Sequence, residues 1–168
     1  MRPFLTRTTI LLNDVRQSII NGAIDGGTKL ETGGALFGFD DDSHIVITAS
    51  SGPGPNAVRE QRYFLRDLVH TQAFAETIFS ESGAQWIGEW HTHPHGPTEP
   101  SERDLRTYAE HLFDMELDLD AFVSVIVIPA KMHHDVAVHL WCLERFESNI
   151  LIHRVDPQIG EMHDGRTV

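Results

Sequence analysis

One stretch in the middle of the chain predicts a strand, a loop and the beginning of a helix. The sequence of residues 88–104 is GEWHTHPHGPTEPSERD. Side chains two positions apart on a strand point to the same face, so His91 and His93 are expected to project side by side. Pro94 lacks the N–H that a strand interior needs and therefore ends the strand. Ser101 is a favoured residue at a helix N-cap, which places Asp104 in the first helical turn, where it can fold back toward the histidines.

Two histidines and one carboxylate are the ligand types of a catalytic zinc site. Such a site keeps a fourth position for water, whereas structural zinc sites usually fill all four positions with protein ligands. Bound zinc lowers the pKa of its water to about 7 and polarises a substrate carbonyl. The His-x-His pair is weak evidence alone, because it occurs in several unrelated hydrolase classes. The spacing of Ser101 and Asp104 also fits a simple helix cap, so both interpretations stay open at this point.

A metallohydrolase also needs a group that moves protons without binding the metal, and Glu31 is a candidate. It lies just before a predicted strand, in the stretch LETGGALFG of residues 30–38. Gly33 and Gly34 lack side chains and would permit another backbone element to approach closely. A carboxylate within reach of an attacking water can act as general acid and base. Taken alone, however, Glu31 is better explained as a solvated loop carboxylate.

The histidine motif, the serine and aspartate after it, and the upstream glutamate together resemble one known family. WHTHP at residues 90–94 and PSERD at residues 100–104, preceded by Glu31 and two glycines, resemble the JAMM (MPN-plus) metalloproteases. The pattern of that family is Glu, then His-Ser/Thr-His-Pro, then Ser-x-x-Asp, and the resemblance covers roughly residues 5 to 145. It implies a mixed α/β fold with a sheet flanked by helices. It also implies zinc-dependent cleavage of peptide or isopeptide bonds, often after the C-terminal glycine of ubiquitin or a ubiquitin-like protein.

Carried over position by position, the resemblance assigns a role to five residues. It implies one Zn²⁺ ion per chain, bound by His91, His93 and Asp104, with water as the fourth ligand. It implies general acid and base catalysis by Glu31 and stabilisation of the oxyanion by the Ser101 hydroxyl. All five positions carry the expected residue type, which favours an active enzyme over the metal-less scaffolds of this fold.

Three further parts of the sequence resemble bacterial stand-alone members of the family, some of which occur in antiphage operons. These parts are the loop of residues 52–57, the stretch FLRD at residues 64–67 and the pair Glu89-Trp90. The implied partners are a ubiquitin-like protein or its conjugate, and ubiquitin-ligase-like proteins of the same operon. Two alternatives stay open: a metal-dependent hydrolase of small adducts on a sulfur-carrier protein, and a non-catalytic protein-binding module of the MPN fold. Residues 52–62 and 115–121 are expected at the rim of the cleft.

The remaining sequence predicts the elements around this site. Segments rich in β-branched residues predict strands at Thr8–Leu12, Gly34–Phe39, His44–Ala49, Trp86–His93, Phe122–Ile128 and Val136–Leu143. Apolar residues at helical spacing predict helices at Val15–Ala23, Leu68–Phe79 and Glu102–Phe113. We therefore expect the α/β class, with a single MPN/JAB-like domain over residues 1–150 and a mixed β-sheet flanked by helices. Residues 151–168 are expected to form a polar C-terminal tail.

Composition favours one globular domain and argues against several kinds of partner. Hydrophobic residues make up 40% of the 168 residues and charged residues 23%, as in ordinary globular proteins. The formal net charge is −12 and Lys and Arg form no cluster, which argues against nucleic acid as a partner. Neither a signal peptide nor a transmembrane helix is legible, so no membrane partner is expected. Cys142 is the only cysteine, and we expect a reducing, cytoplasmic location.

Overall fold

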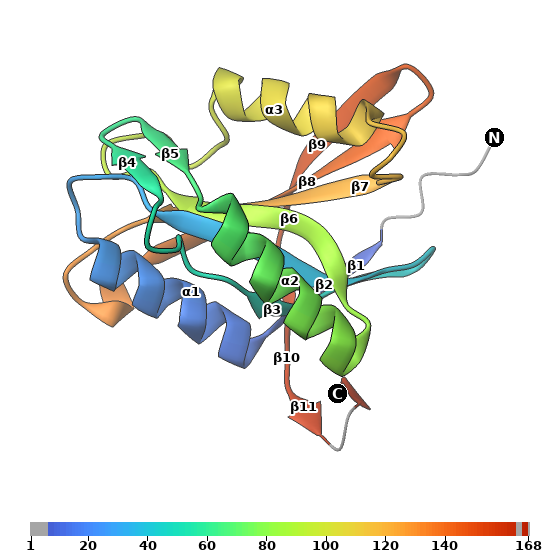
Figure 1. Ribbon diagram of the computed structural model, residues 1–168, viewed down its shortest axis with the longest axis horizontal. Helices are drawn as coiled ribbons and strands as arrows, with labels where there is room; N and C mark the ends of the chain where they lie inside the picture. The colour runs from blue at the N-terminus through green and yellow to red at the C-terminus, as the bar shows by residue number, and fades with distance from the viewer. Residues whose placement is uncertain (1–6, 164–165, 168) are drawn as a thin grey trace.

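An eight-stranded mixed sheet lies at the centre of the computed structural model, which describes residues 7–163 and 166–167 (Figure 1). The strand order of this sheet is β10-β1-β3-β2-β6-β7-β8-β9. Its strands are β1 Thr8–Leu12, β2 Gly33–Asp40, β3 His44–Ser50, β6 Gln85–Thr92, β7 Ala121–Ile128, β8 Ala137–Phe146, β9 Asn149–Val155 and β10 Gln158–Gly160. Two small hairpins pair outside it, β4 Val58–Glu60 with β5 Tyr63–Leu65, and β11 Met162–His163 with β12 Arg166–Thr167.

Helices cover both faces of the sheet. In the described residues these are α1 Asn13–Gly26, α2 Leu68–Ser82 and α3 Glu102–Phe113, with a short 3-10 helix at His133–Asp135. Leu36 of β2 packs in one core with α1, whereas its neighbours Ala35 and Phe37 pack in another core with α2. Because successive strand residues alternate between faces, α1 and α2 lie on opposite sides of the sheet. Figure 1 shows α1 below the sheet and α3 above it.

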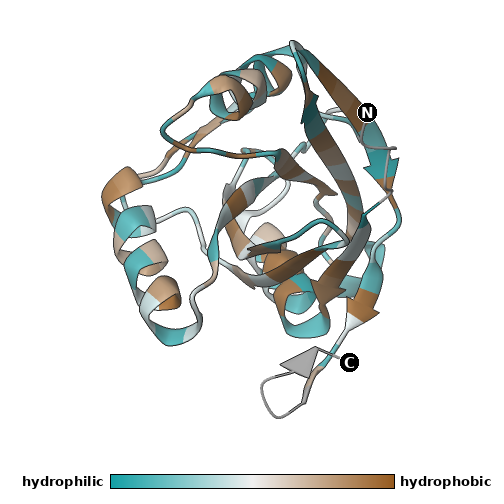
Figure 2. Cartoon of the chain, turned by 90° about the vertical axis from the view of Figure 1, so that its right-hand side faces the viewer, coloured by the Kyte–Doolittle hydropathy of each residue, from teal (hydrophilic) through white to brown (hydrophobic). Residues whose placement is uncertain are grey.

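The helix that carries Asp104 is held to the sheet by a narrow apolar face. Tyr108 and Leu112 of α3 are four residues apart and both are 0% exposed, packed against Phe122 of β7 and Leu143 of β8. Residues four apart share one side of a helix, so the opposite side faces solvent. In Figure 2, hydrophobic residues run along the strands of the sheet, whereas the helices carry both hydrophobic and hydrophilic stretches.

An irregularity in the pairing of β2 with β6 sets which face the site residues occupy. The register shifts between Leu36 and Phe37 of β2, and Ile87 is the additional residue on β6. Trp86 packs with α2 and α3, whereas Ile87 packs with α1. Residues an even number of positions apart normally share a face of the sheet. Across an extra residue on one strand, residues an odd number of positions apart share a face instead. His91, an odd number of residues after Trp86, therefore lies on the same face as Trp86 and α3.

The observed elements match most of the sequence predictions. The six predicted strands and three predicted helices are confirmed, with ends that differ by a few residues, and the single α/β domain with a mixed, helix-flanked sheet is confirmed. The hairpin β4–β5 was not predicted. None of the helices in the described part of the chain is long and apolar enough to span a membrane.

The C-terminal segment differs from the expectation of a polar tail. The boundary expected at residue 150 falls inside β9, which pairs with β8 from Phe146↔Asn149 to Leu140↔Val155. Residues 158–160 form β10, which pairs in parallel with β1. Backbone hydrogen bonds to the sheet hold this segment, and its few apolar anchors, Ile150 and Val155, pack against the cores. Part of the expected tail is therefore sheet.

Candidate metal centre

His91 lies near the end of β6 and His93 directly follows this strand, in the interior of the sheet. His91 pairs with Gly33 of β2 on one side and with β7 on the other. His91 is 3% exposed and His93 is 5% exposed, so both rings are removed from bulk water. Thr92 donates its N–H to Thr32 O at 2.8 Å, and its hydroxyl accepts the Thr32 N–H at 2.9 Å. This exchange extends the β2–β6 pairing and holds the backbone that carries both rings.

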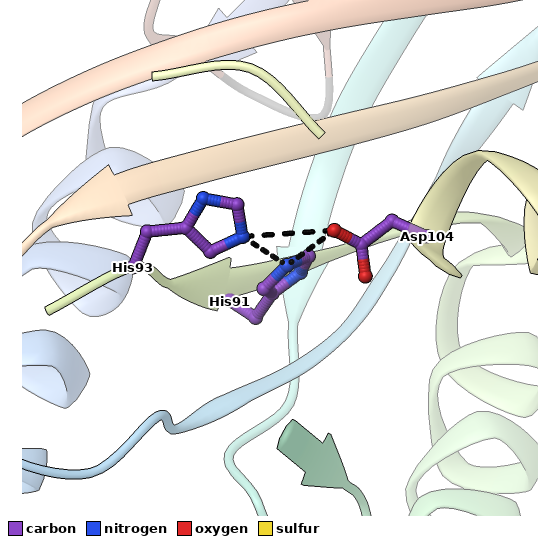
Figure 3. Close-up of side chains that lie close together, drawn as sticks. All are labelled: His91, His93 and Asp104. Carbon is purple, nitrogen blue, oxygen red and sulfur yellow. Dashed lines mark hydrogen bonds and ion pairs between the residues drawn. The ribbon is translucent and has the colours of Figure 1, made fainter. Parts of the chain in front are cut away.

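Asp104 reaches the histidines from the first turn of α3. The Ser101 hydroxyl accepts the N–H of Asp104 at 3.2 Å, and Asp104 Oδ2 accepts the N–H of Ser101 at 2.7 Å, which together form a capping box. The same Oδ2 lies 3.4 Å from His91 Nε2 and 3.6 Å from His93 Nε2 (Figure 3). The helix cap expected from the Ser101–Asp104 spacing is therefore present, and it directs the carboxylate at the two imidazoles.

The three ligand atoms have the spacing that one tetrahedral metal ion requires. Zinc binds histidine nitrogen and carboxylate oxygen at about 2.0–2.2 Å, which places neighbouring corners of a tetrahedron about 3.3 Å apart. The observed separations of 2.9, 3.4 and 3.6 Å bracket this value, and the ligand atoms all lie within 4.8 Å of one another. Two imidazoles and one carboxylate leave one tetrahedral position for water. The residues present fit a zinc ion.

Charges around the histidines favour a bound cation. Burial by itself raises the pKa of Asp104, but hydrogen bonds from His91 and His93 hold that pKa well below its ordinary value. Burial by itself lowers the pKa of His91, but Asp104, and then the charges of Glu89 and Glu31, raise that pKa above its ordinary value. Three carboxylates around two buried imidazoles form a pocket that attracts positive charge.

The second histidine is oriented by the loop that follows it. His93 Nδ1 lies 2.9 Å from Pro97 O, a carbonyl that can only accept, so Nδ1 carries the proton and Nε2 keeps its lone pair for a metal. Trp141 of β8 donates its indole N–H to Thr98 O at 3.0 Å. This contact ties the loop to the sheet next to the carbonyl that orients His93.

Glu31 is held beside the histidines by the β4–β5 hairpin. Its N–H donates to Glu60 O at 2.8 Å, and Arg59 Nε donates to Glu31 O at 3.0 Å. Arg59 also donates to Gly26 O at 2.6 Å, which links this turn to the end of α1. The Glu31 side chain is half-buried and lines the same cleft as the histidines. Burial raises the pKa of Glu31 above its ordinary value, although the nearby histidines oppose this effect.

A cleft of about 430 Å³ opens over the histidines and Asp104. Residues that line it include Glu31, Tyr63, Phe64, Glu89, His95, Ser101 and Arg103. One wall is β5 and the opposite wall is the start of α3, and the guanidinium of Arg103 lies over the Tyr63 ring at 5.1 Å. All five residues predicted to form the active site therefore contact one cleft.

The predicted rim is only partly correct. Of residues 52–62, Gln61 and Arg62 line the cleft, and the wall continues along β5 through Arg66. Residues 115–121 do not line it, because they follow α3 at the end opposite to Asp104.

Sequence reasoning also missed Glu89, which lines the cleft behind His91. The sequence could have indicated Glu89, because Glu89, His91 and His93 are spaced two residues apart and side chains at this spacing in an extended segment share a face.

The chain belongs to the family described as prokaryotic homologs of the JAB domain, whose model matches residues 18–143. This match spans both the predicted ligands and Glu31, and it confirms the resemblance to JAMM proteins.

Curated relatives and one solved structure are similar to this chain. A "CD-NTase/cGAS isopeptidase" of Escherichia coli is 36% identical over 83 residues, which are 48% of this chain and 53% of that protein. A "Probable metalloprotease" of Sinorhizobium fredii is 31% identical over 99 residues, 55% of this chain and 60% of that protein. The matches thus span little more than half of these relatives. The solution structure of a protein from Desulfitobacterium hafniense has a TM-score of 0.66 at 16% identity, covering 95% of this chain and 99% of that one, and supports the fold.

Proposed function

We propose that this protein is a zinc-dependent isopeptidase or peptidase that cleaves after the C-terminus of a ubiquitin-like protein. The observation that carries the proposal is the convergence of His91 Nε2, His93 Nε2 and Asp104 Oδ2 on the floor of an open cleft. Membership of the JAB family and the names of the relatives, isopeptidase and metalloprotease, support the same reaction class.

His91, His93 and Asp104 would hold the zinc ion. When bound, zinc lowers the pKa of water and polarises a carbonyl. Glu31 would take a proton from the attacking water and pass it to the leaving amine. The raised pKa of Glu31 suits a carboxylate that must both accept and release a proton.

Ser101 can stabilise the oxyanion without giving up its place at the helix cap. In the cap its oxygen accepts the N–H of Asp104, so the hydroxyl proton stays available for donation. Ser101 also lines the cleft. A donor preorganised toward developing negative charge is the arrangement that acyl-transfer enzymes use to stabilise the transition state.

The proposed substrate is a ubiquitin-like protein joined to a target or to a C-terminal extension. The name of the relatives from Escherichia coli and Vibrio cholerae suggests a CD-NTase or cGAS-like protein as the target of the conjugate. We propose action in the cytoplasm, in an antiphage operon with ubiquitin-ligase-like partners, as the JAMM resemblance implies.

The test compares wild type with Glu31→Gln on ubiquitin-like proteins that carry a C-terminal peptide extension. Wild type should release the extension, and Glu31→Gln should bind zinc normally with turnover lower by about 10²–10⁴-fold. Comparable turnover in the variant would refute the assigned role of Glu31. Release of small adducts from a sulfur carrier, without cleavage of the fusions, would favour the small-adduct hydrolase. Equal capture of a partner by both proteins, without cleavage by wild type, would favour a binding module.

A further inference from the structure

A further carboxylate lies behind the candidate metal centre, on the side of His91 away from the other ligands. Glu89 Oε1 is 3.6 Å from His91 Nδ1, the ring nitrogen that does not face His93 and Asp104. Among the described residues, His91 Nδ1 is a buried atom without a hydrogen-bond partner. Buried polar atoms nearly always have a partner, so this nitrogen requires an explanation.

Glu89 is itself fixed by other side chains. Arg66 Nη1 donates to Glu89 Oε2 at 3.0 Å, and the Tyr108 hydroxyl donates to Glu89 Oε1 at 2.9 Å. Ser124 Oγ in turn donates to the Tyr108 hydroxyl at 3.1 Å, and both of these residues are 0% exposed. Each carboxylate oxygen therefore has a donor that holds it, and Glu89 is not free to swing toward the metal position.

The other two predicted ligands, His93 and Asp104, each have a hydrogen-bond partner that orients the side chain. His93 Nδ1 has the carbonyl of Pro97, and Asp104 Oδ2 has the N–H of Ser101. A histidine that binds a metal commonly donates its other N–H to a carboxylate or carbonyl, which fixes the ring and its tautomer. Of the three predicted ligands, His91 is the one without an orienting hydrogen bond, and the fixed carboxylate of Glu89 faces its Nδ1.

We propose that Glu89 is a positioning residue of the metal centre, which accepts the Nδ1–H of His91 and keeps its Nε2 lone pair directed at the ion. Tyr108 and Arg66 hold Glu89 in place for this contact. The present 3.6 Å exceeds hydrogen-bond distance, so the proposal requires His91 Nδ1 and Glu89 Oε1 to move closer together when the ion binds. The proposal rests on the zinc site of the proposed function.

The test measures zinc affinity by competition with a chelator at neutral pH. Glu89→Gln keeps the side-chain shape, but its amide has one accepting oxygen for the three donors Arg66, Tyr108 and His91. Zinc affinity should fall about 10- to 100-fold. Tyr108→Phe keeps the charge of Glu89 but removes one of the hydrogen bonds that hold it, and should lower zinc affinity about 2- to 10-fold. Glu110→Gln, the same change at an exposed position of α3, is the matched control and should leave zinc affinity unchanged.

A second measurement separates positioning from a merely structural role. In the zinc-loaded wild type, the His91 Nδ1 proton should give a slowly exchanging imidazole NMR signal, which Glu89→Gln should lose and Glu89→Asp should partly restore. The proposal is overturned when folded Glu89→Gln binds zinc within about twofold of wild type. Should Glu89→Gln not fold, an unchanged zinc affinity of Tyr108→Phe overturns it. Absence of zinc binding by wild type would overturn the proposed function as well, so the two failures are distinguishable.

Discussion

Substitution of Gly33 by alanine tests the close approach of β2 to the strand that carries the histidines. A Cβ atom at Gly33 would lie 2.2 Å from Trp90 O, 2.8 Å from His91 Cβ and 2.9 Å from Phe64 Cε1. The nearest atom is a backbone oxygen, which cannot rotate away. The two strands must therefore separate by about 1 Å to restore van der Waals contact, beside the pair Gly33↔His91.

The expected loss of folding stability in Gly33→Ala follows from this overlap. Overpacking of an interior costs about 1–3 kcal/mol, and the upper part of that range, about 2–3 kcal/mol, applies because the neighbour is backbone. For a domain of this size, each kcal/mol lowers Tm by about 2–4 °C, so Gly33→Ala should melt about 4–12 °C below wild type. The assay is thermal unfolding followed by circular dichroism, in the presence of a chelator so that bound metal makes no contribution.

Gly52→Ala is the matched control for Gly33→Ala. A Cβ atom at Gly52 would meet no heavy atom within 4 Å. The free energy of unfolding of this variant should be unchanged or higher by about 0.4–1 kcal/mol, because alanine restricts the unfolded chain. Equal melting temperatures for the two variants would contradict the reasoning, since they would mean that β2 and β6 are not in such close contact.

Three further predictions concern the metal centre and the core. Asp104→Asn keeps a side-chain oxygen for the Ser101 N–H, so α3 should persist by circular dichroism while bound zinc, measured by mass spectrometry, falls well below one per chain; full occupancy would mean that Asp104 is not a ligand. Trp141→Phe removes the indole N–H that donates to Thr98 O, so zinc affinity should fall about 2- to 10-fold, and an unchanged affinity would contradict the role of this contact in orienting the loop. Burial raises the pKa of the Cys142 thiol to about 12. Iodoacetamide at about pH 8 should therefore label Cys142 only after unfolding, and rapid labelling of the folded protein would disagree with a buried thiol.

The histidine–aspartate cluster could be predicted because its residues are close in sequence and each obeys a local rule. Strand alternation places His91 and His93 on one face, and the helix-cap preference of Ser101 places Asp104 in the first turn of α3. Neither rule depends on the rest of the fold. The same alternation would have placed the missed Glu89 on that face, but only the structure places its carboxylate beside His91 Nδ1.

Glu31 required more than a local rule. It lies far upstream of the histidines, and sequence motifs connect it to them only through the family resemblance. In the structure, the pairing of β2 with β6 and the exchange between Thr32 and Thr92 bring this part of the chain to the site. The two small residues Gly33 and Gly34 permit that approach, as the sequence suggested.

The missed elements are those whose stability comes from distant partners. β4 and β5 have three residues each, too few to establish an alternating pattern. β9 and β10 are recognised by their pairing with β8 and β1, which no local pattern encodes. Contacts with residues distant in sequence therefore determine that β4 and β5, beside the cleft, and the segments of the expected tail form strands.

The most direct test of the metal centre compares the zinc content of purified wild-type protein with that of His91→Ala. One zinc per chain is predicted in wild type and none in the variant, with both proteins folded by circular dichroism. Wild type without zinc after reconstitution, or a variant that retains one zinc per chain, would contradict the assignment of the metal centre.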